Sequence, residues 1–79
     1  MPARLVAVLR FEARHQAVND DTRVGLVRQA FGLSLVRYRQ RLLAALRHPG
    51  AADVEPALVA RLTDVLARRP RRGTSTREA

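Results

Sequence analysis

The sequence contains no cysteine, no lysine, no tryptophan and only three aromatic residues among its 79 positions. Without cysteine, neither a disulfide framework nor a cysteine-based zinc knuckle can stabilise the chain. No apolar run approaches the roughly 20 residues of a membrane span. The apolar stretch from Leu5 to Leu9 is short and is followed by Arg10, so we do not expect a secretory signal. The length predicts one small domain.

Residue patterns typical of enzymes are also missing. Ser34 is not part of a G-x-S-x-G motif, and there is no glycine pattern of the kind that binds phosphate groups. His15 and His48 are far apart and lack the spacing of metal ligands, and Glu12 has no second acid nearby in the sequence. We therefore expect no enzymatic activity, no cofactor and no metal.

Positive charge dominates the composition. All 15 basic side chains are arginines, they face 7 acidic residues, and the formal net charge is +8. Arginine suits phosphate groups and guanine edges, although a GC-rich genome accounts for most of the preference over lysine. Residues 68–79 carry 5 arginines and 1 acidic residue but no Leu, Ile, Val or aromatic residue. The sequence thus predicts a folded domain over 1–67 and a disordered Arg-rich tail over 68–79.

Apolar residues before this tail recur at helical spacing in four segments, at about 4–17, 22–31, 35–47 and 56–68. This pattern predicts an all-α compact bundle of about four helices, with a loop over 49–55. The first segment is apolar around its circumference, which is typical of a helix that packs on two sides or lies at a dimer interface. We expect Asp20 or Asp21 to cap the second helix, and Gly25 to mark a close helix approach.

The clearest motif joins the second and third helices. A helix that ends at Phe31 would turn at Gly32 in a left-handed conformation, Leu33 would anchor the turn in the core, and Ser34 would cap the next helix. This pattern predicts a helix-turn-helix over 22–47. Many such units have a small residue four positions before the glycine, so Arg28 must either point into solvent or alter the helix crossing.

Two further side-chain predictions concern the core. We expect Tyr38 to be a core residue with its hydroxyl at the edge, not a platform for stacking bases. We expect Glu12 to pair with Arg39 or Arg28.

Further short motifs accompany this turn along about residues 9–72. They are Phe11-Glu12, Phe31-Gly32-Leu33-Ser34, Arg37-Tyr38 with Gln40, Glu55-Pro56, Leu58-Val59 and Arg61-Leu62. In these motifs the sequence resembles a family of small actinobacterial proteins of unknown function that are described as helix-turn-helix-like. The sequence departs from the family pattern at Arg39, where the family has a second tyrosine, and at Glu55, where it has aspartate. Arg39 lies toward the apolar side of the third helix, so its head must reach an acid or solvent. The resemblance implies the fold more than a function.

The third helix carries the functional hypothesis. Its outer face is basic, an α-helix fits the major groove, and arginine reads guanine while glutamine reads adenine. We therefore predict a DNA-binding protein of the cytoplasmic nucleoid, a transcriptional regulator that reads double-stranded DNA with some sequence specificity. The candidate DNA-binding residues are Ser34, Leu35, Val36, Arg37, Gln40, Arg41 and Arg47 in the helix, and Arg68, Arg69, Arg71 and Arg72 in the tail.

Other interpretations remain open at this stage. The basic face could simply be solvated, and the tail could serve solubility alone. The first helix could dock a transcription-machinery protein or another partner, which would make the chain a protein-interaction module. A homodimer through the first or last helix is also expected, since one recognition helix gives modest affinity. Binding to an anionic membrane surface ranks last, because the third helix lacks the Trp and Phe typical of such helices.

Overall fold

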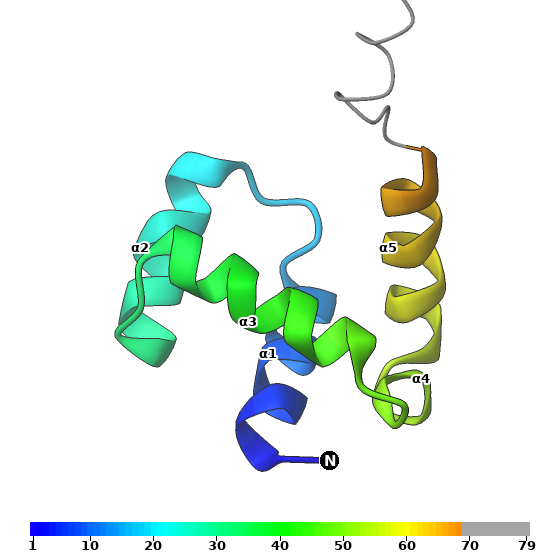
Figure 1. Cartoon of the computed structure of the whole chain (residues 1–79). Coiled ribbons are helices and arrows are strands. Elements are labelled where there is room, and N and C mark those ends of the chain that lie inside the picture. Colours follow the sequence, from blue (N-terminus) through cyan, green and yellow to red (C-terminus); the bar gives the residue numbers. More distant parts are fainter. Residues whose placement is uncertain (69–79) are drawn as a thin grey trace, which may run out of the picture.

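The computed structural model describes residues 1–68, and five helices with no strand form that part of the chain (Figure 1). The helices are α1 (Ala3–Arg14), α2 (Asp20–Phe31), α3 (Leu35–Arg47), α4 (Ala51–Val54) and α5 (Pro56–Arg68). The predicted all-α fold is confirmed, and the predicted bounds of α3 and α5 are correct. The segment predicted as a loop after α3 contains the short helix α4.

The start of α2 differs from the prediction. Asn19, and neither Asp20 nor Asp21, is the N-cap residue, and its side-chain oxygen accepts a hydrogen bond of 2.8 Å from the backbone N–H of Thr22. The two aspartates instead occupy the first turn of the helix. Negative side chains are favourable there because the helix dipole places partial positive charge at the N-terminus. The cap therefore lies one or two residues earlier than expected, and α2 begins two residues earlier.

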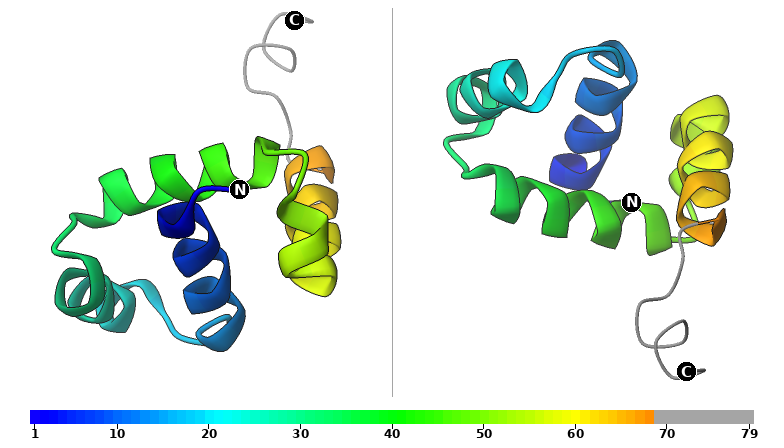
Figure 2. Two further views of the ribbon diagram at one scale, coloured as in Figure 1. Left: turned by 90° about the horizontal axis from the view of Figure 1, so that it is seen from below. Right: turned by 90° about the horizontal axis from the view of Figure 1, so that it is seen from above.

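Helix α1 is packed on several sides, as its apolar circumference predicted. It crosses α3 and also contacts α4 and α5 (Figures 1 and 2). Val8 and Leu9 are fully buried. Leu9 lies in a core that joins α1, α3, α4 and α5, whose other buried members are Ala45, Ala51 and Leu58. The helix ends at Arg14, so Ala17 lies in the turn that follows it.

A second core joins α1, α2 and α3 through Val8, Val27 and Tyr38. The rings of Phe11, Phe31 and Tyr38 pack against one another here, with centroids 5.1–5.8 Å apart. Such aromatic contacts add stabilisation beyond that of burial alone. The prediction that Gly25 marks a close helix approach is wrong, because a Cβ atom built on Gly25 would have no neighbour within 4 Å.

Helices α4 and α5 complete the first core from the other end of α3. α4 has only four residues, and Ala51 is its buried member. So short an element has no apolar period to detect, which explains why it was predicted as a loop. α5 stands beside α4 at an angle to α3 (Figure 2). It buries Leu58 but leaves Val65 and Leu66 more than two-fifths exposed.

Candidate nucleic-acid interface

The turn between α2 and α3 has the predicted local structure. Gly32 adopts φ +69°, and its N–H donates to the carbonyl oxygen of Arg28 at 2.8 Å. Leu33 is half-buried against the aromatic core. Ser34 caps α3, since its hydroxyl oxygen accepts a hydrogen bond from the Arg37 backbone N–H at 3.2 Å. Arg28 is exposed, so its side chain does not separate the two helices.

A buried polar cluster fixes how these helices meet. The Glu12 carboxylate in α1 accepts a hydrogen bond of 2.7 Å from Arg23 of α2 and another of 2.7 Å from the Tyr38 hydroxyl of α3. Glu12 and Arg23 are each only 7 % exposed. The prediction that Glu12 pairs with Arg39 or Arg28 is therefore wrong. The Tyr38 hydroxyl lies in the interior and not at the edge of the core.

Arg23 also stabilises the connection between α1 and α2. Its other terminal nitrogen donates to the carbonyl oxygens of His15 and Val18, each at 3.2 Å. Cationic donors are favourable near carbonyls at the end of a helix. The guanidinium therefore holds the end of α1, the connection and α2 together. Because Tyr38 donates to the same carboxylate, α3 has a fixed position relative to both helices.

Burial raises the pKa of Tyr38 well above its ordinary value, and the hydrogen bond to the negatively charged Glu12 raises it further. The phenol therefore remains a neutral donor in the folded protein. It can hold the carboxylate across the physiological pH range.

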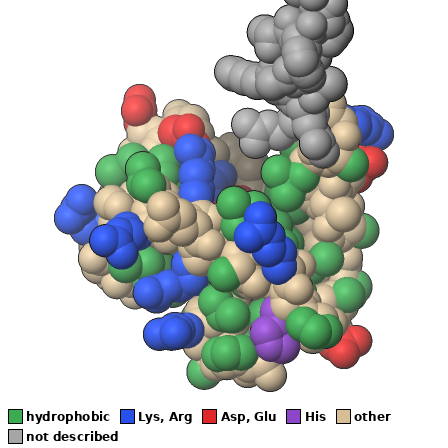
Figure 3. Space-filling model, viewed as in Figure 1, with side chains coloured by type: hydrophobic (Ala, Val, Ile, Leu, Met, Phe, Trp, Pro, Cys, Tyr) green, Lys and Arg blue, Asp and Glu red, His purple; other side chains and the backbone are tan. Residues whose placement is uncertain are grey.

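The outward face of α3 differs from its buried face in both exposure and charge. Val36 is 67 % exposed, and Arg37, Gln40 and Arg47 are exposed. Leu35 and Arg41 are half-buried. No acidic residue occurs in α3. Cationic side chains gather over α2 and α3 on the face drawn in Figure 3.

One arginine of α3 is already engaged. Arg39 donates to Asp20 at 2.8 Å, as expected for a side chain whose head must reach an acid or solvent. This contact joins α3 to the first turn of α2, on the side of α3 away from Arg37 and Arg41. Arg39 therefore contributes less free positive charge than the arginines of the outward face.

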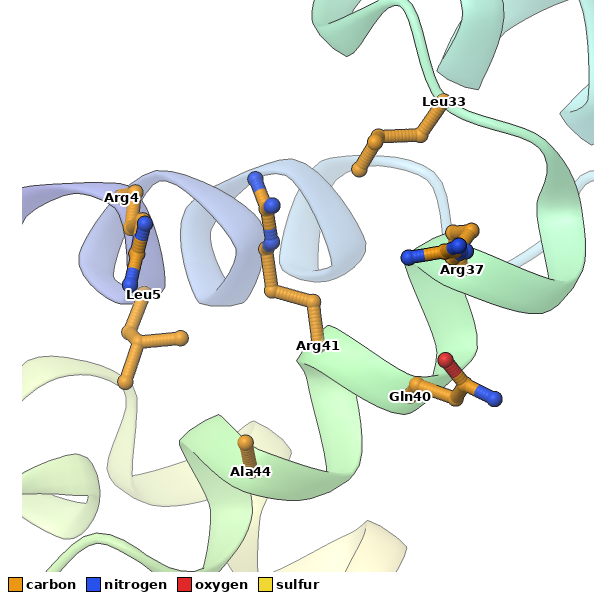
Figure 4. A pocket seen from close by; sticks show the side chains of 7 residues that line it. All are labelled: Arg4, Leu5, Leu33, Arg37, Gln40, Arg41 and Ala44. Carbon is orange, nitrogen blue, oxygen red and sulfur yellow. The ribbon is translucent and has the colours of Figure 1, made fainter.

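A hollow of about 370 Å³ lies between the N-terminal part of α1 and the outward face of α3 (Figure 4). Figure 4 shows Arg41 extending from α3 toward α1, where Arg4 lies, and Leu33 entering from the turn. The lining residues are Arg4, Leu5, Leu33, Arg37, Gln40, Arg41 and Ala44. Arg37, Gln40 and Arg41 were predicted from the sequence as DNA-binding candidates, whereas Arg4 was not. Nothing in the local sequence indicated that the start of α1 lies beside α3.

The charge around this hollow is unbalanced. No acidic side chain lines it, and Arg4, Arg37 and Arg41 form no ion pair within residues 1–68. Leu5 and Leu33 supply apolar walls. Guanidinium groups without a carboxylate partner attract an anion through both their charge and their hydrogen-bond donors. The hollow is therefore a place where an anionic group would be stabilised.

The structure does not bring all the predicted site residues together. Arg47 lies on the side of α3 nearer α5, where it lines another hollow with Leu43 and Leu66. Arg68 is the last residue of α5 and pairs with Asp64 at 2.9 Å, so it is not part of a tail as predicted. Arg69, Arg71 and Arg72 lie outside the described residues, as does the predicted disorder of the tail.

An apolar groove of about 210 Å³ separates α3 from α5. Leu43, Val65 and Leu66 are partly exposed along it. The residues that line it are Arg39, Leu42, Leu43, Leu46, Leu62, Val65 and Leu66. Within residues 1–68, large exposed apolar side chains occur on α2 (Val24), α3 (Val36 and Leu43) and α5 (Val65 and Leu66), whereas α1 has none.

Fold and site together define a small all-α protein with a cationic hollow beside its third helix. The chain belongs to the family described as "protein of unknown function (DUF3263)", whose model matches residues 1–74. The predicted membership of an uncharacterised family is thereby confirmed. No curated protein and no solved structure matches the chain. Within residues 1–68, no helix has the length and apolar character needed to cross a bilayer.

Proposed function

We propose that this protein binds duplex DNA as a helix-turn-helix protein, with α3 in the major groove, and that it acts as a transcriptional regulator at the nucleoid. The observation that carries the proposal is the acid-free surface formed by α3 and the start of α1. Arg37 and Arg41 are without ion-pair partners in the part of the chain described. DNA phosphates and guanine edges are the acceptors that best match such guanidinium groups.

The side chains on the first turns of α3 suit base contacts. Val36 is largely exposed, and an apolar side chain at this position can contact a thymine methyl group. Gln40 has the donors that match adenine, and Arg37 has donors that match either a guanine edge or a phosphate oxygen. In helix-turn-helix proteins the N-terminal part of the second helix meets the bases. The Ser34 cap and the half-buried Leu35 then act by holding that end of the helix in place.

The other arginines would supply affinity without sequence preference. Arg47 lies toward the end of α3, where a phosphate contact is the expected role. Arg68 is tied to Asp64, which weakens its contribution. Arg69, Arg71 and Arg72 would add contacts to phosphates, as basic arms do.

The test is a titration of labelled duplex DNA by fluorescence anisotropy at about 100 mM salt. The variant Arg37→Ala/Arg41→Ala is compared with Arg14→Ala/Arg61→Ala, which removes the same charge from exposed positions on α1 and α5. We expect the first variant to lose at least about tenfold in affinity and the control to lose far less. Circular dichroism checks that both variants fold. If both variants lost affinity equally, net charge and not the α3 face would explain the binding. If the first variant lost no affinity, the proposal would be overturned.

A protein-interaction module remains the second candidate. The observation that favours it is the apolar groove between α3 and α5, because the apolar residues of α1 are mostly covered by α3, α4 and α5. A transcription-machinery protein or a second copy of the chain would have to meet that surface. Heparin retention together with the DNA titration discriminates the two functions. Salt-dependent DNA binding supports the first, whereas a stable protein complex with negligible DNA affinity supports the second.

A further inference from the structure

We propose that the hollow between α1 and α3 is a phosphate-binding site, and that Arg4 of α1 forms it together with Arg37 and Arg41 of α3. The group that binds there is a phosphate. Its assignment to a backbone phosphodiester of duplex DNA rests on the proposed function. The site extends the DNA contact from one helix to two. It also gives α1, which the sequence placed only in the core, a direct part in binding.

The charge and the hydrogen-bond donors that line the hollow suit a phosphate better than a neutral ligand. Its polar lining consists of Arg4, Arg37 and Arg41 with Gln40, and all of these side chains carry hydrogen-bond donors. Guanidinium groups bind phosphate oxygens through two parallel hydrogen bonds, a geometry that an ammonium group cannot provide. An anion seated among them would also relieve the mutual repulsion of the three cations.

Arg4 belongs to a helix that is anchored in the core, so the position of its backbone is fixed. Arg4 lies in the first turn of α1, one turn before the fully buried Val8. α1 is held against α3 by Val8, by Leu9 and by the hydrogen bond that the Tyr38 hydroxyl donates to Glu12. Arg4 and Arg41 are therefore presented by two helices whose relative position is fixed. Because the two helices need not rearrange, binding costs less entropy than it would with a mobile helix.

The location of the hollow also matches the path of a DNA strand. Val36 and Arg37 belong to the first turn of α3, whereas Arg41 and Ala44 lie further along the same face. With the first turn in the groove, the later part of the face approaches the groove edge, where the phosphates run. Contacts of this kind fix the register of a recognition helix.

The test uses the full chain and single substitutions at exposed positions. Arg4→Ala is compared with Arg14→Ala, which removes the same charge from the other end of α1. We expect Arg4→Ala to weaken duplex DNA binding about tenfold and to lower the slope of log affinity against log salt by about 0.9, the value for one phosphate that is no longer neutralised. Arg4→Lys should retain the slope but not the full affinity, because it keeps the charge and loses the planar fork. Arg4→Ala and Arg14→Ala with equal affinities and slopes would overturn the site.

A second measurement separates DNA from a free phosphate ligand. Inorganic phosphate is titrated into the full chain at constant ionic strength, with chloride as the matched anion, while the arginine side-chain N–H signals are followed by nuclear magnetic resonance. We expect phosphate to shift the signals of Arg4, Arg37 and Arg41 and to leave those of Arg14 and Arg61 unchanged. Absence of selective shifts would contradict a phosphate site.

The results of the two experiments distinguish a failure of the phosphate site from a failure of the proposed function. Loss of DNA binding in Arg37→Ala but not in Arg4→Ala would overturn the site while DNA binding stands. Selective phosphate shifts together with no DNA affinity in any variant would uphold the phosphate site and overturn its assignment to DNA. The hollow would then hold a free phosphate-bearing ligand.

Discussion

At the scale of single residues, Glu12 is the side chain that ties the molecule together. It accepts one hydrogen bond from Arg23 and one from Tyr38, so a single carboxylate contacts side chains from α2 and α3. Burying an ion pair costs desolvation energy, which good geometry and additional hydrogen bonds offset. All buried side-chain nitrogen and oxygen atoms in residues 1–68 have a partner. The cluster therefore specifies one arrangement of three helices.

Tyr38 provides a pH-dependent test of this cluster. Its pKa is raised in the folded protein by burial and by Glu12, whereas in the unfolded chain it ionises near its ordinary value of about 10. The stabilisation is complete below about pH 10 and decreases as the pH rises toward the folded-state pKa, because only the unfolded state then releases the proton. We expect the free energy of unfolding to fall by up to about 1.4 kcal/mol for each pH unit above 10.

The Tyr38→Phe variant separates this effect from general alkaline denaturation. It should lose about 1.5–3 kcal/mol at neutral pH, because it lacks the hydrogen bond to a charged acceptor. Above pH 10 it should show a weaker loss of stability than the parent protein. Tyr38 is the single tyrosine of the chain, so tyrosinate absorbance reports on it alone. A folded protein whose tyrosine titrates near pH 10 would contradict this account.

Residue-scale interactions divide into those that sequence reasoning can reach and those that it cannot. The Ser34 cap and the Gly32 turn were predictable, because each follows from neighbours in the chain. The Glu12 partners were not, since Arg23 is 11 positions away on another helix. Arg4 was missed for the same reason, because its partners in the hollow belong to α3.

At the scale of elements, two glycines of α2 and its turn have opposite roles. Gly32 adopts φ +69°, a conformation that costs an L-residue roughly 1–2 kcal/mol, whereas Gly25 lies inside a helix with open space around it. Gly32→Ala should therefore destabilise the protein by about 1–2 kcal/mol. Gly25→Ala should stabilise it by about 0.5–1 kcal/mol, because alanine favours the helix interior.

Urea unfolding of the two variants measures this contrast directly. Each substitution adds one methyl group at an exposed position, so each variant serves as the control for the other. A loss of stability in both variants would mean that Gly25 has a packing role after all. A neutral Gly32→Ala would show that the turn relaxes out of the left-handed conformation at little cost.

Helix boundaries could be predicted where local sequence signals set them, and not where tertiary packing sets them. α3 and α5 were predicted at their observed bounds, because each has a strong apolar stripe and a clear start or stop signal. α4 has neither, and Ala51 becomes buried only because α1, α3 and α5 surround it. The same dependence on other elements explains why the face of α1 looked available for a partner. Its packing against α3, α4 and α5 covers it.

At the scale of the whole molecule, net charge governs how the protein would approach DNA. The formal charge of +8 is divided, and residues 69–79 contain Arg69, Arg71, Arg72 and Arg77 against one acidic residue. Arginines on the α3 face would provide selectivity between sequences, whereas those near the C-terminus would provide affinity for any sequence. These two contributions respond differently to salt and to mutation.

A protein that ends after Arg68 separates the two contributions, because it keeps every described residue of α1 to α5 and lacks the four arginines that follow. We expect the truncated protein to bind all duplexes more weakly at about 100 mM salt, with a log–log salt slope lower by about 0.9 for each phosphate that the tail would have neutralised. Four arginines are removed, so the slope should fall by at most about 3.6. The ratio of affinities for a selected site and an unrelated duplex should not change, because α3 is intact.

A full-length variant with Arg69, Arg71, Arg72 and Arg77 replaced by Gln controls for chain length in this experiment. It should show the same reduction of the salt slope as the truncated protein, because the two proteins lack the same four guanidinium groups. If the slope stays the same as that of the parent in both proteins, the tail takes no part in binding. If the affinity ratio collapses instead, sequence selectivity belongs to the tail and not to α3.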